Sequence, residues 1–293
     1  MSARLPRNKA TFSDIYESCW KTRKNETLRQ RCQEDEGLII AANESLESSS
    51  AHDFPLDAEQ FGAKGSLSKD ELIELYDKGL MKLSDAKRYV IAIKKGASGR
   101  CSYCGRSLPP LDLSLDHFFP KSVYPLLSVS PTNLIPSCRD CNEGQKRDRT
   151  FEKYDEMPYN PYFEENQIAR WLLAEIRVDD CRPYVAYSIR PLSPEDNGDD
   201  RSRAQNYFEL FNLGERYSLT ATDEIQARQG EYVSCYKLLG CAQFLIIRRA
   251  VYESCLKGAS MEYWRPAFEY ALMTSEKYHA FLEDEVKREG SVE

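Results

Sequence analysis

The chain has 293 residues, 41% of them hydrophobic, and a formal net charge of −7 at pH 7. This apolar content is ordinary for a globular protein and is sufficient for one sizeable domain or for two or three small ones. No stretch approaches the roughly 18 consecutive apolar residues of a membrane-spanning helix, and the basic N-terminal segment lacks the apolar run of a secretory signal. We therefore expect a cytoplasmic protein that does not bind a membrane.

Positive charge is concentrated in one part of the chain. Residues 86–149 contain eleven Lys and Arg against five Asp and Glu, a local charge of +6, so the remainder carries −13. Binding to nucleic acid follows local rather than total charge, so this segment is compatible with such a contact. Charge runs more often form solvated faces, which is the alternative interpretation.

The first hundred residues are predicted to form helices and loops. Residues 12–32 are polar with apolar positions at mixed spacing, and residues 43–51 have the composition of a linker. Ser68 and Glu71 form a capping-box pattern, in which two side chains satisfy free backbone N–H groups at the start of a helix. A further helix is predicted over residues 84–95, before a glycine-containing turn.

The C-terminal part of the chain is predicted to be mainly helical. Residues 184–189 alternate in a way typical of a strand, and residues 191–200 are rich in loop-forming types. Helical patterns follow in three segments, residues 204–213, 223–257 and 263–287. We expect the first of these to end at Gly214 and the second to break near Gly240.

The chain contains ten cysteines, four of which form the CxxC pairs Cys101–Cys104 and Cys138–Cys141. Each pair places two thiolates on one ion through a tight turn, so together they supply four ligands of a tetrahedral zinc; a redox-active CxxC is the alternative. A closed four-cysteine site leaves no position open for water, so this zinc is expected to be structural. The other cysteines are expected to be reduced and mostly buried: Cys19, Cys32, Cys181, Cys235, Cys241 and Cys255.

A second group of polar residues lies between the two CxxC pairs and directly after the second pair. Asp116 and His117 are consecutive, Asn133 follows within Asn-Leu-Ile-Pro, and Asn142 comes directly after the last cysteine of the pairs. In this order, with zinc cysteines on both sides, residues 100–149 resemble the HNH endonuclease family. The resemblance implies a mainly α protein with a small ββα-metal (HNH) nuclease core, stapled by the four-cysteine zinc site.

The resemblance also implies a role for each of these side chains. Phosphodiester hydrolysis needs a base for the attacking water, and a histidine near its ordinary pKa can deprotonate water at neutral pH, so His117 is the candidate general base. Asp116 and Asn142 match the family's ligands for one catalytic cation, Mg²⁺ or Mn²⁺, which prefer hard oxygen ligands. Asn133 matches the family's middle residue, which braces the hairpin and orients the base.

Two short antiparallel strands, residues 111–117 and 132–136, and a helix over 139–149 are predicted around these residues. Regular alternation would send Asp116 and His117 to opposite faces, so we expect the strand to end or bulge there. Five basic residues are candidate phosphate contacts: Lys121, Arg139, Lys146, Arg147 and Arg149. The other two histidines, His52 and His279, have no partners at ligand spacing and are expected to be structural or solvated.

We expect three regions: a helical N-terminal region (1–95), an HNH nuclease domain (96–165) and a mainly helical C-terminal region (166–293). The sequence has no P-loop and no Rossmann glycine pattern, so the chain is not expected to hydrolyse nucleoside triphosphates itself. More loosely, the chain resembles HNH effectors of bacterial antiphage systems such as the Septu type. That resemblance implies a protein partner such as an ABC-like ATPase.

The resulting hypothesis is a metal-dependent DNA endonuclease that acts in an antiphage complex. An RNA nuclease, for example one that cuts tRNA, is an alternative, because a site that grips phosphate need not distinguish the sugar. A zinc-stabilised adaptor without catalysis is a third. The adaptor hypothesis predicts that His117→Ala leaves function unchanged, whereas both nuclease hypotheses predict loss of cleavage.

Overall fold

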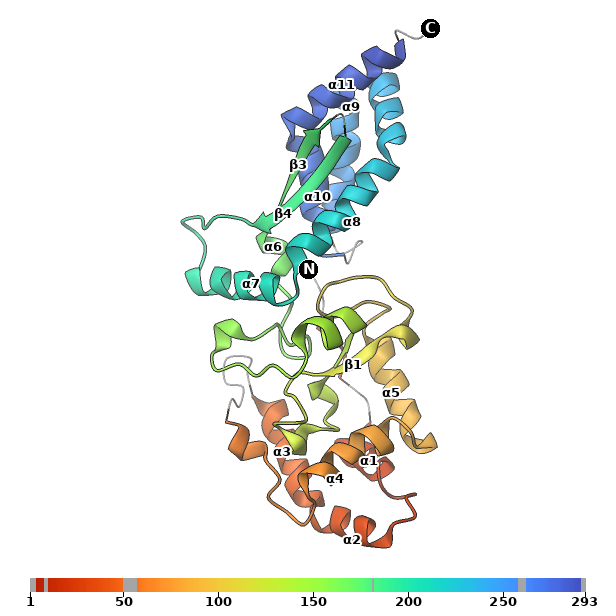
Figure 1. Ribbon diagram of the computed structural model, residues 1–293, viewed down its shortest axis with the longest axis vertical. Helices are drawn as coiled ribbons and strands as arrows, with labels where there is room; N and C mark the ends of the chain where they lie inside the picture. Colours follow the sequence, from red (N-terminus) through yellow and green to blue (C-terminus); the bar gives the residue numbers. More distant parts are fainter. Residues whose placement is uncertain (1–3, 8–9, 50–56, 181, 258–261, 291–293) are drawn as a thin grey trace. The chain divides into compact units, whose positions relative to one another are not determined.

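The computed structural model describes residues 4–7, 10–49, 57–180, 182–257 and 262–290. The chain divides into two compact units, Ala3–Glu165 and Asn166–Glu293, each described by itself below (Figure 1). Both units are mainly helical, and within the described ranges each contains one two-stranded antiparallel sheet. No helix in this part of the chain is long and apolar enough to cross a membrane.

The first unit holds a short hairpin among helices. Strands β1 (Ser114–His117) and β2 (Leu134–Ser137) pair antiparallel, and the π-helical segment η7 (Asp140–Lys146) follows β2 and contacts β1. The longer helices of this unit are α1 (Phe12–Ser18), α2 (Glu26–Glu34), α3 (Glu36–Ser48), α4 (Lys69–Glu74), η3 (Leu75–Leu80) and α5 (Ser84–Gly96). Both strands are shorter than predicted, because residues 110–112 form a 3-10 turn and residues 131–133 another.

A local signal places the start of α4 correctly. At the start of α4, the Ser68 hydroxyl accepts from the backbone of Glu71, and the Glu71 carboxylate accepts from the backbone of Ser68, as the capping box predicts.

The linker prediction for residues 43–51 is wrong as far as Ser48, where α3 ends. Asn43 and Leu46 are buried on α3, and their burial favours helix over the polar composition of the segment. Residues 50–51 lie outside the described residues.

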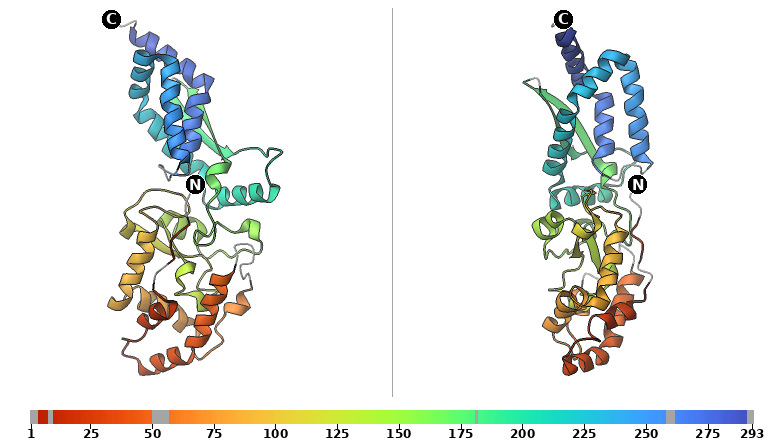
Figure 2. Two further views of the ribbon diagram at one scale, coloured as in Figure 1. Left: turned by 180° about the vertical axis from the view of Figure 1, so that it is seen from behind. Right: turned by 90° about the vertical axis from the view of Figure 1, so that its right-hand side faces the viewer.

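The second unit is built on a hairpin that helices cover. Strands β3 (Leu172–Asp179) and β4 (Arg182–Ile189) show alternating burial, so one face of the sheet is packed. Helix α8 (Leu213–Ala227) packs on β4, whereas α10 (Arg265–Thr274) and α11 (Glu276–Gly290) pack on β3 (Figure 2). The predicted strand over 184–189 is confirmed within β4; its partner β3 was not predicted, although its polar and apolar residues also alternate.

The helices of the second unit differ from the prediction at their ends. Helix α7 (Gly198–Leu210) is followed by Asn212 with φ 48°, and Gly214 lies inside α8, so the predicted C-terminal role of Gly214 is wrong. A Cβ at Gly214 would lie 3.0 Å from the Phe208 ring, so this glycine allows a close approach instead. Helix α9 (Gln229–Leu256) breaks at Gly240, as predicted. The helical stretch predicted over 263–287 is two helices, α10 and α11.

Candidate metal centre and histidine site

Four cysteines meet in the interior of the first unit. Cys101 and Cys104 come from a turn before β1, whereas Cys138 follows β2 and Cys141 lies in η7. All four are buried, and their sulfur atoms lie within 4.8 Å of one another. Four thiolates around a tetrahedral zinc with bonds of about 2.3 Å place the sulfurs roughly 3.8 Å apart. The Cys104 and Cys138 sulfurs are 3.8 Å apart, so the cluster can hold a metal such as zinc.

The four thiols of this cluster shift in opposite directions, because the pKa of Cys101 and of Cys141 is raised whereas the pKa of Cys104 is lowered by hydrogen bonds within the cluster. The pKa of the Cys138 thiol lies far below its usual range, because Cys101, Cys104 and Cys141 donate hydrogen bonds to its sulfur. Thiolates are the ligands that zinc and other soft metals prefer. Among the remaining cysteines, three are buried (Cys19, Cys32 and Cys255) and two are half-buried (Cys235 and Cys241), while Cys181 lies outside the described residues.

Asp116 is buried and already has polar partners. Its Oδ2 accepts a hydrogen bond from the Tyr103 hydroxyl at 2.6 Å and lies 3.1 Å from the Lys146 ammonium. The carboxylate is 3% exposed and Lys146 is completely buried. Burial raises the pKa of Asp116, while the positive charge of Lys146 opposes that rise. The predicted cation ligand therefore lies inside an ion pair in this structure.

His117 lies at the end of β1 and faces a different set of neighbours. Its Nε2 lies 2.8 Å from the carbonyl oxygen of Ser128, and its ring meets the Tyr76 ring edge-on at a centroid distance of 4.4 Å. Burial lowers the pKa of His117 to about 3. The strand ladder is regular up to this residue and the strand ends here, one of the two predicted outcomes.

The two asparagines make different hydrogen bonds. Asn133 is fully buried, and its side chain bonds the backbone N–H and carbonyl of Phe119 and the carbonyl of Leu127. It therefore braces the loop that follows His117. Asn142 donates to the Ser114 hydroxyl at 3.1 Å. Ser114 and Asp116 share a face of β1 because they are two residues apart, so Asn142 lies over the Asp116 side of the strand.

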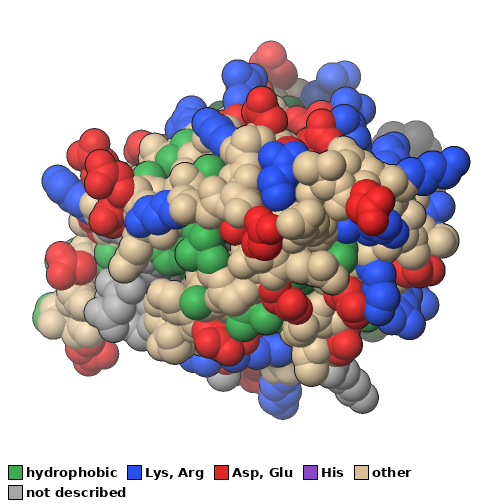
Figure 3. Space-filling view, turned by 90° about the horizontal axis from the view of Figure 1, so that it is seen from below, with side chains coloured by type: hydrophobic (Ala, Val, Ile, Leu, Met, Phe, Trp, Pro, Cys, Tyr) green, Lys and Arg blue, Asp and Glu red, His purple; other side chains and the backbone are tan. Residues whose placement is uncertain are grey.

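The five predicted phosphate contacts have different surroundings. Lys146 is completely buried, so in this structure its ammonium reaches Asp116 and not the surface. The ammonium of Lys121 pairs with Asp77 at 2.5 Å, and the exposed Arg139 pairs with Glu143 at 2.6 Å. The remaining two, Arg147 and Arg149, are exposed. On the face shown in Figure 3, basic and acidic side chains lie next to one another and are not separated by sign.

Three residues around the site were not predicted. The Tyr103 hydroxyl donates a hydrogen bond to Asp116, and the Ser128 carbonyl accepts one from His117. The Tyr76 ring packs on the His117 ring. The position of Tyr103 between two cysteines was the available signal for its role. Tyr76 lies 41 positions before His117 in the sequence, and Ser128 acts through its backbone, so neither carries a pattern that sequence analysis detects.

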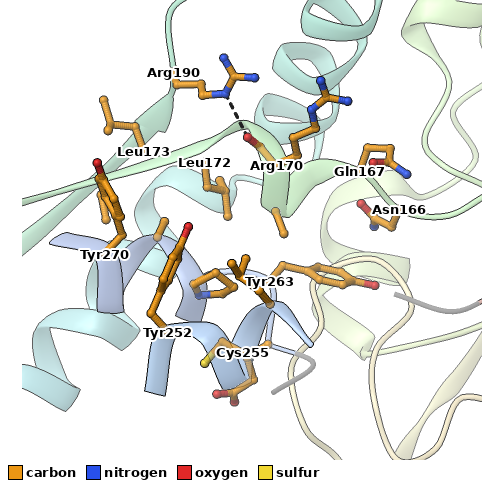
Figure 4. Close-up of a pocket in the computed structure, with 16 residues that line it drawn as sticks. Asn166, Gln167, Arg170, Leu172, Leu173, Arg190, Tyr252, Cys255, Tyr263 and Tyr270 are labelled. Carbon is orange, nitrogen blue, oxygen red and sulfur yellow. Dashed lines mark hydrogen bonds between the residues drawn. The ribbon is translucent and has the colours of Figure 1, made fainter. Parts of the chain in front are cut away.

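The second unit contains a separate cavity of about 570 Å³ between β3 and helices α9 and α10. Figure 4 shows Leu172 and Tyr252 at this cavity, with Arg170 and Arg190 at one edge. Three partly exposed apolar side chains also line it, namely Leu173, Leu256 and Tyr270. Its lining includes one cysteine, Cys255, and no histidine, and is mainly apolar and aromatic.

Comparison with known proteins gives two similarities. The chain is 28% identical to protein ea31 of Escherichia phage lambda over 230 residues, which cover 73% of this chain and 75% of that protein. It is 38% identical to the Septu protein PtuB of Bacillus thuringiensis over 63 residues, which cover 20% of this chain and 24% of PtuB. No protein-family model matches the chain, and no solved structure matches it.

Proposed function

We propose that this chain is an HNH-type endonuclease that hydrolyses phosphodiester bonds of DNA, with His117 as its general base. The observation that carries the proposal is the way in which the His117 ring is held. A backbone carbonyl only accepts hydrogen bonds, so the Nε2 atom facing the Ser128 oxygen must carry the ring hydrogen. The other nitrogen, Nδ1, then has the lone pair that accepts a proton from water.

The environment of His117 suits this role. Burial keeps the ring neutral at pH 7, and only a neutral imidazole accepts a proton. A base with such a low pKa is weak in the free protein. The negative charge of a bound phosphodiester raises the pKa of an adjacent imidazole, because it stabilises the protonated ring. Substrate binding is therefore expected to strengthen the base when it is needed.

The two expected metals differ in how well the residues fit them. The four cysteines form a donor set that fits zinc, which would tie the turn before β1 to the start of η7. The oxygen donors expected for Mg²⁺ or Mn²⁺, Asp116 and Asn142, do not form a site that fits such a cation. A divalent cation at Asp116 would meet the Lys146 ammonium, which lies 3.1 Å from the same oxygen, and like charges at such distances repel strongly. The proposed chemistry therefore rests on His117.

A cleavage assay tests the proposal with a matched histidine control. Wild-type protein, His117→Ala and His279→Ala are each incubated with plasmid DNA and with total RNA, with and without Mg²⁺ or Mn²⁺. We expect wild type and His279→Ala to cut DNA, and His117→Ala to be slower by about 10² to 10⁴-fold, the range for loss of a general base. Zinc content and circular dichroism should be equal in all three proteins.

The alternatives predict different results in the same assay. Cleavage of RNA but not of plasmid would support the RNA nuclease hypothesis. Absence of cleavage of either substrate by zinc-loaded wild type would favour the adaptor. Cleavage by wild type only in the presence of Mg²⁺ or Mn²⁺ would mean that a cation binds elsewhere or that Lys146 leaves Asp116.

We further propose that the protein acts in bacterial antiphage defence with an ATPase partner. This proposal is supported by the short similarity to the Septu protein PtuB alone, since the longer similarity is to a protein of a phage. Co-purification with the products of neighbouring genes, scored for an ATPase, tests the partner. If the chain purifies alone and cuts DNA without a partner, the complex is excluded and the nuclease proposal is retained.

A further inference from the structure

Lys146 makes two contacts at the end of β1. Its ammonium lies 3.1 Å from Oδ2 of Asp116 and donates to the backbone carbonyl of His117 at 2.7 Å. The side chain is 0% exposed. A buried ammonium is strongly unfavourable unless it is paired and hydrogen-bonded. The buried ammonium therefore needs both contacts. They hold Asp116 and His117, and His117 is the proposed base.

Asp116 connects this lysine to the cysteine cluster. The Tyr103 hydroxyl, which donates to the same carboxylate at 2.6 Å, belongs to the turn between Cys101 and Cys104 and is completely buried. A continuous set of contacts thus runs from the cysteine cluster through Tyr103, Asp116 and Lys146 to the backbone of His117. Hydrogen bonds to a charged group are stronger than neutral ones, so this set restricts the end of the strand.

We propose, on the basis of the proposed function, that Lys146 and not a divalent cation compensates Asp116, and that Tyr103, Asp116 and Lys146 are positioning residues for His117. In this arrangement Asp116 makes no contact with substrate or metal. The Asp116 carboxylate holds the Lys146 ammonium, which donates to the backbone carbonyl of His117. The same contacts join the cysteine cluster to His117. Loss of the metal is therefore expected to loosen the position of the His117 ring.

A double-mutant cycle separates a positioning ion pair from a metal ligand. The variants are Asp116→Asn, Lys146→Met and the double variant, with Lys78→Met as a control that removes an exposed ammonium paired with Glu74. Each single variant leaves one buried group without its partner, whereas the double variant removes both charges. We expect each single variant to lose at least tenfold in cleavage rate, and the double variant to lose no more than Lys146→Met alone, because Asp116 acts only through Lys146.

Binding of Mn²⁺, measured by electron paramagnetic resonance without substrate, provides a readout that does not depend on cleavage. We expect Asp116→Asn and wild type to bind Mn²⁺ with affinities within about twofold of each other, since the proposal gives Asp116 no metal to hold. A tenfold or greater loss of Mn²⁺ affinity in Asp116→Asn would overturn the proposal. A double variant whose loss in cleavage rate equals the product of the two single losses would also overturn it, because the two residues would then act independently.

A nuclear magnetic resonance signature of the His117 ring tests positioning directly. In Lys146→Met and in Tyr103→Phe we expect the imidazole nitrogen signals of His117 to shift or broaden, while those of His279 stay unchanged. Unchanged His117 signals in both variants would contradict the proposal. If wild type cuts no nucleic acid, the proposed function fails, and the Mn²⁺ and resonance measurements still decide whether Lys146 compensates Asp116 and positions His117.

Discussion

The ammonium of Lys146 lies 3.1 Å from Oδ2 of Asp116, and neither side chain is more than 3% exposed. The two residues are 30 positions apart in the sequence and come from η7 and β1. Breaking a buried ion pair by removing one member is far more destabilising than removing both, because the remaining charge loses its compensation.

The stability of Lys146→Met is expected to depend on pH. At pH 7 we expect a loss of about 3–5 kcal/mol in the free energy of unfolding, since the Asp116 carboxylate stays buried without its cation. Burial already raises the pKa of Asp116 and Lys146 opposes that rise, so the variant's folded pKa lies higher still. A raised carboxyl pKa means that the folded state binds more protons than the unfolded state.

Because the folded variant binds more protons than its unfolded state, its free energy of unfolding falls as the pH rises. The variant is most stable below the unfolded pKa of Asp116, about 3.9, and loses stability as the pH rises through the raised folded pKa. Urea unfolding of wild type and Lys146→Met at pH 5 and pH 7.5 measures the difference. We expect the gap between the two proteins to be smaller at pH 5. An equal gap at both values would contradict the assignment of a buried, charged Asp116.

Metal analysis should find one zinc ion per chain, bound by the four cysteines. Cys138→Ser is expected to lose the zinc and to lower the melting temperature by at least about 10 °C, because a structural zinc contributes several kcal/mol of folding free energy. Cys235→Ser, a half-buried cysteine outside the cluster, serves as control and should keep both. A metal-free wild type that melts at the same temperature as the loaded protein would be inconsistent with a structural zinc.

Gly79 allows α1 to approach η3 closely. A Cβ at this position would lie 2.5 Å from the backbone oxygen of Cys19, which cannot rotate away. We expect Gly79→Ala to lower the free energy of unfolding by about 1–3 kcal/mol, as overpacked cores do. Gly37→Ala on α3 is the control, since its Cβ meets nothing within 4 Å. Chemical denaturation should show the control to be neutral or up to about 1 kcal/mol more stable.

Gly240 breaks α9 with φ 77° and ψ 166°, a conformation that residues with a Cβ rarely adopt. Gly240→Ala should therefore cost about 1–3 kcal/mol or straighten the helix, although space is available around the position. Gly230→Ala, at the start of the same helix and with open space around it, should be neutral or stabilising. If thermal unfolding shows equal effects for both variants, the break does not depend on the glycine backbone.

Features that depend on neighbouring residues were predictable from the sequence. The capping box of Ser68 and Glu71 begins α4, and residues 84–95 form most of α5. Gly240 interrupts α9, because only glycine adopts that backbone conformation without strain. Predictions failed where burial overrode composition, as in α3, or where a glycine served a close approach, as at Gly214.

The grouping of Cys101, Cys104, Cys138 and Cys141 could be predicted from the sequence, because each CxxC spacing allows two sulfur atoms to reach one ion through a tight turn. The folded chain, and no pattern in the sequence, shows that Asp116 faces Tyr103 and Lys146 while His117 faces Ser128. These contacts join segments that are far apart in the chain. Side-chain partners at a strand end follow from the face on which each residue lies and from what packs there, and no local pattern contains that information.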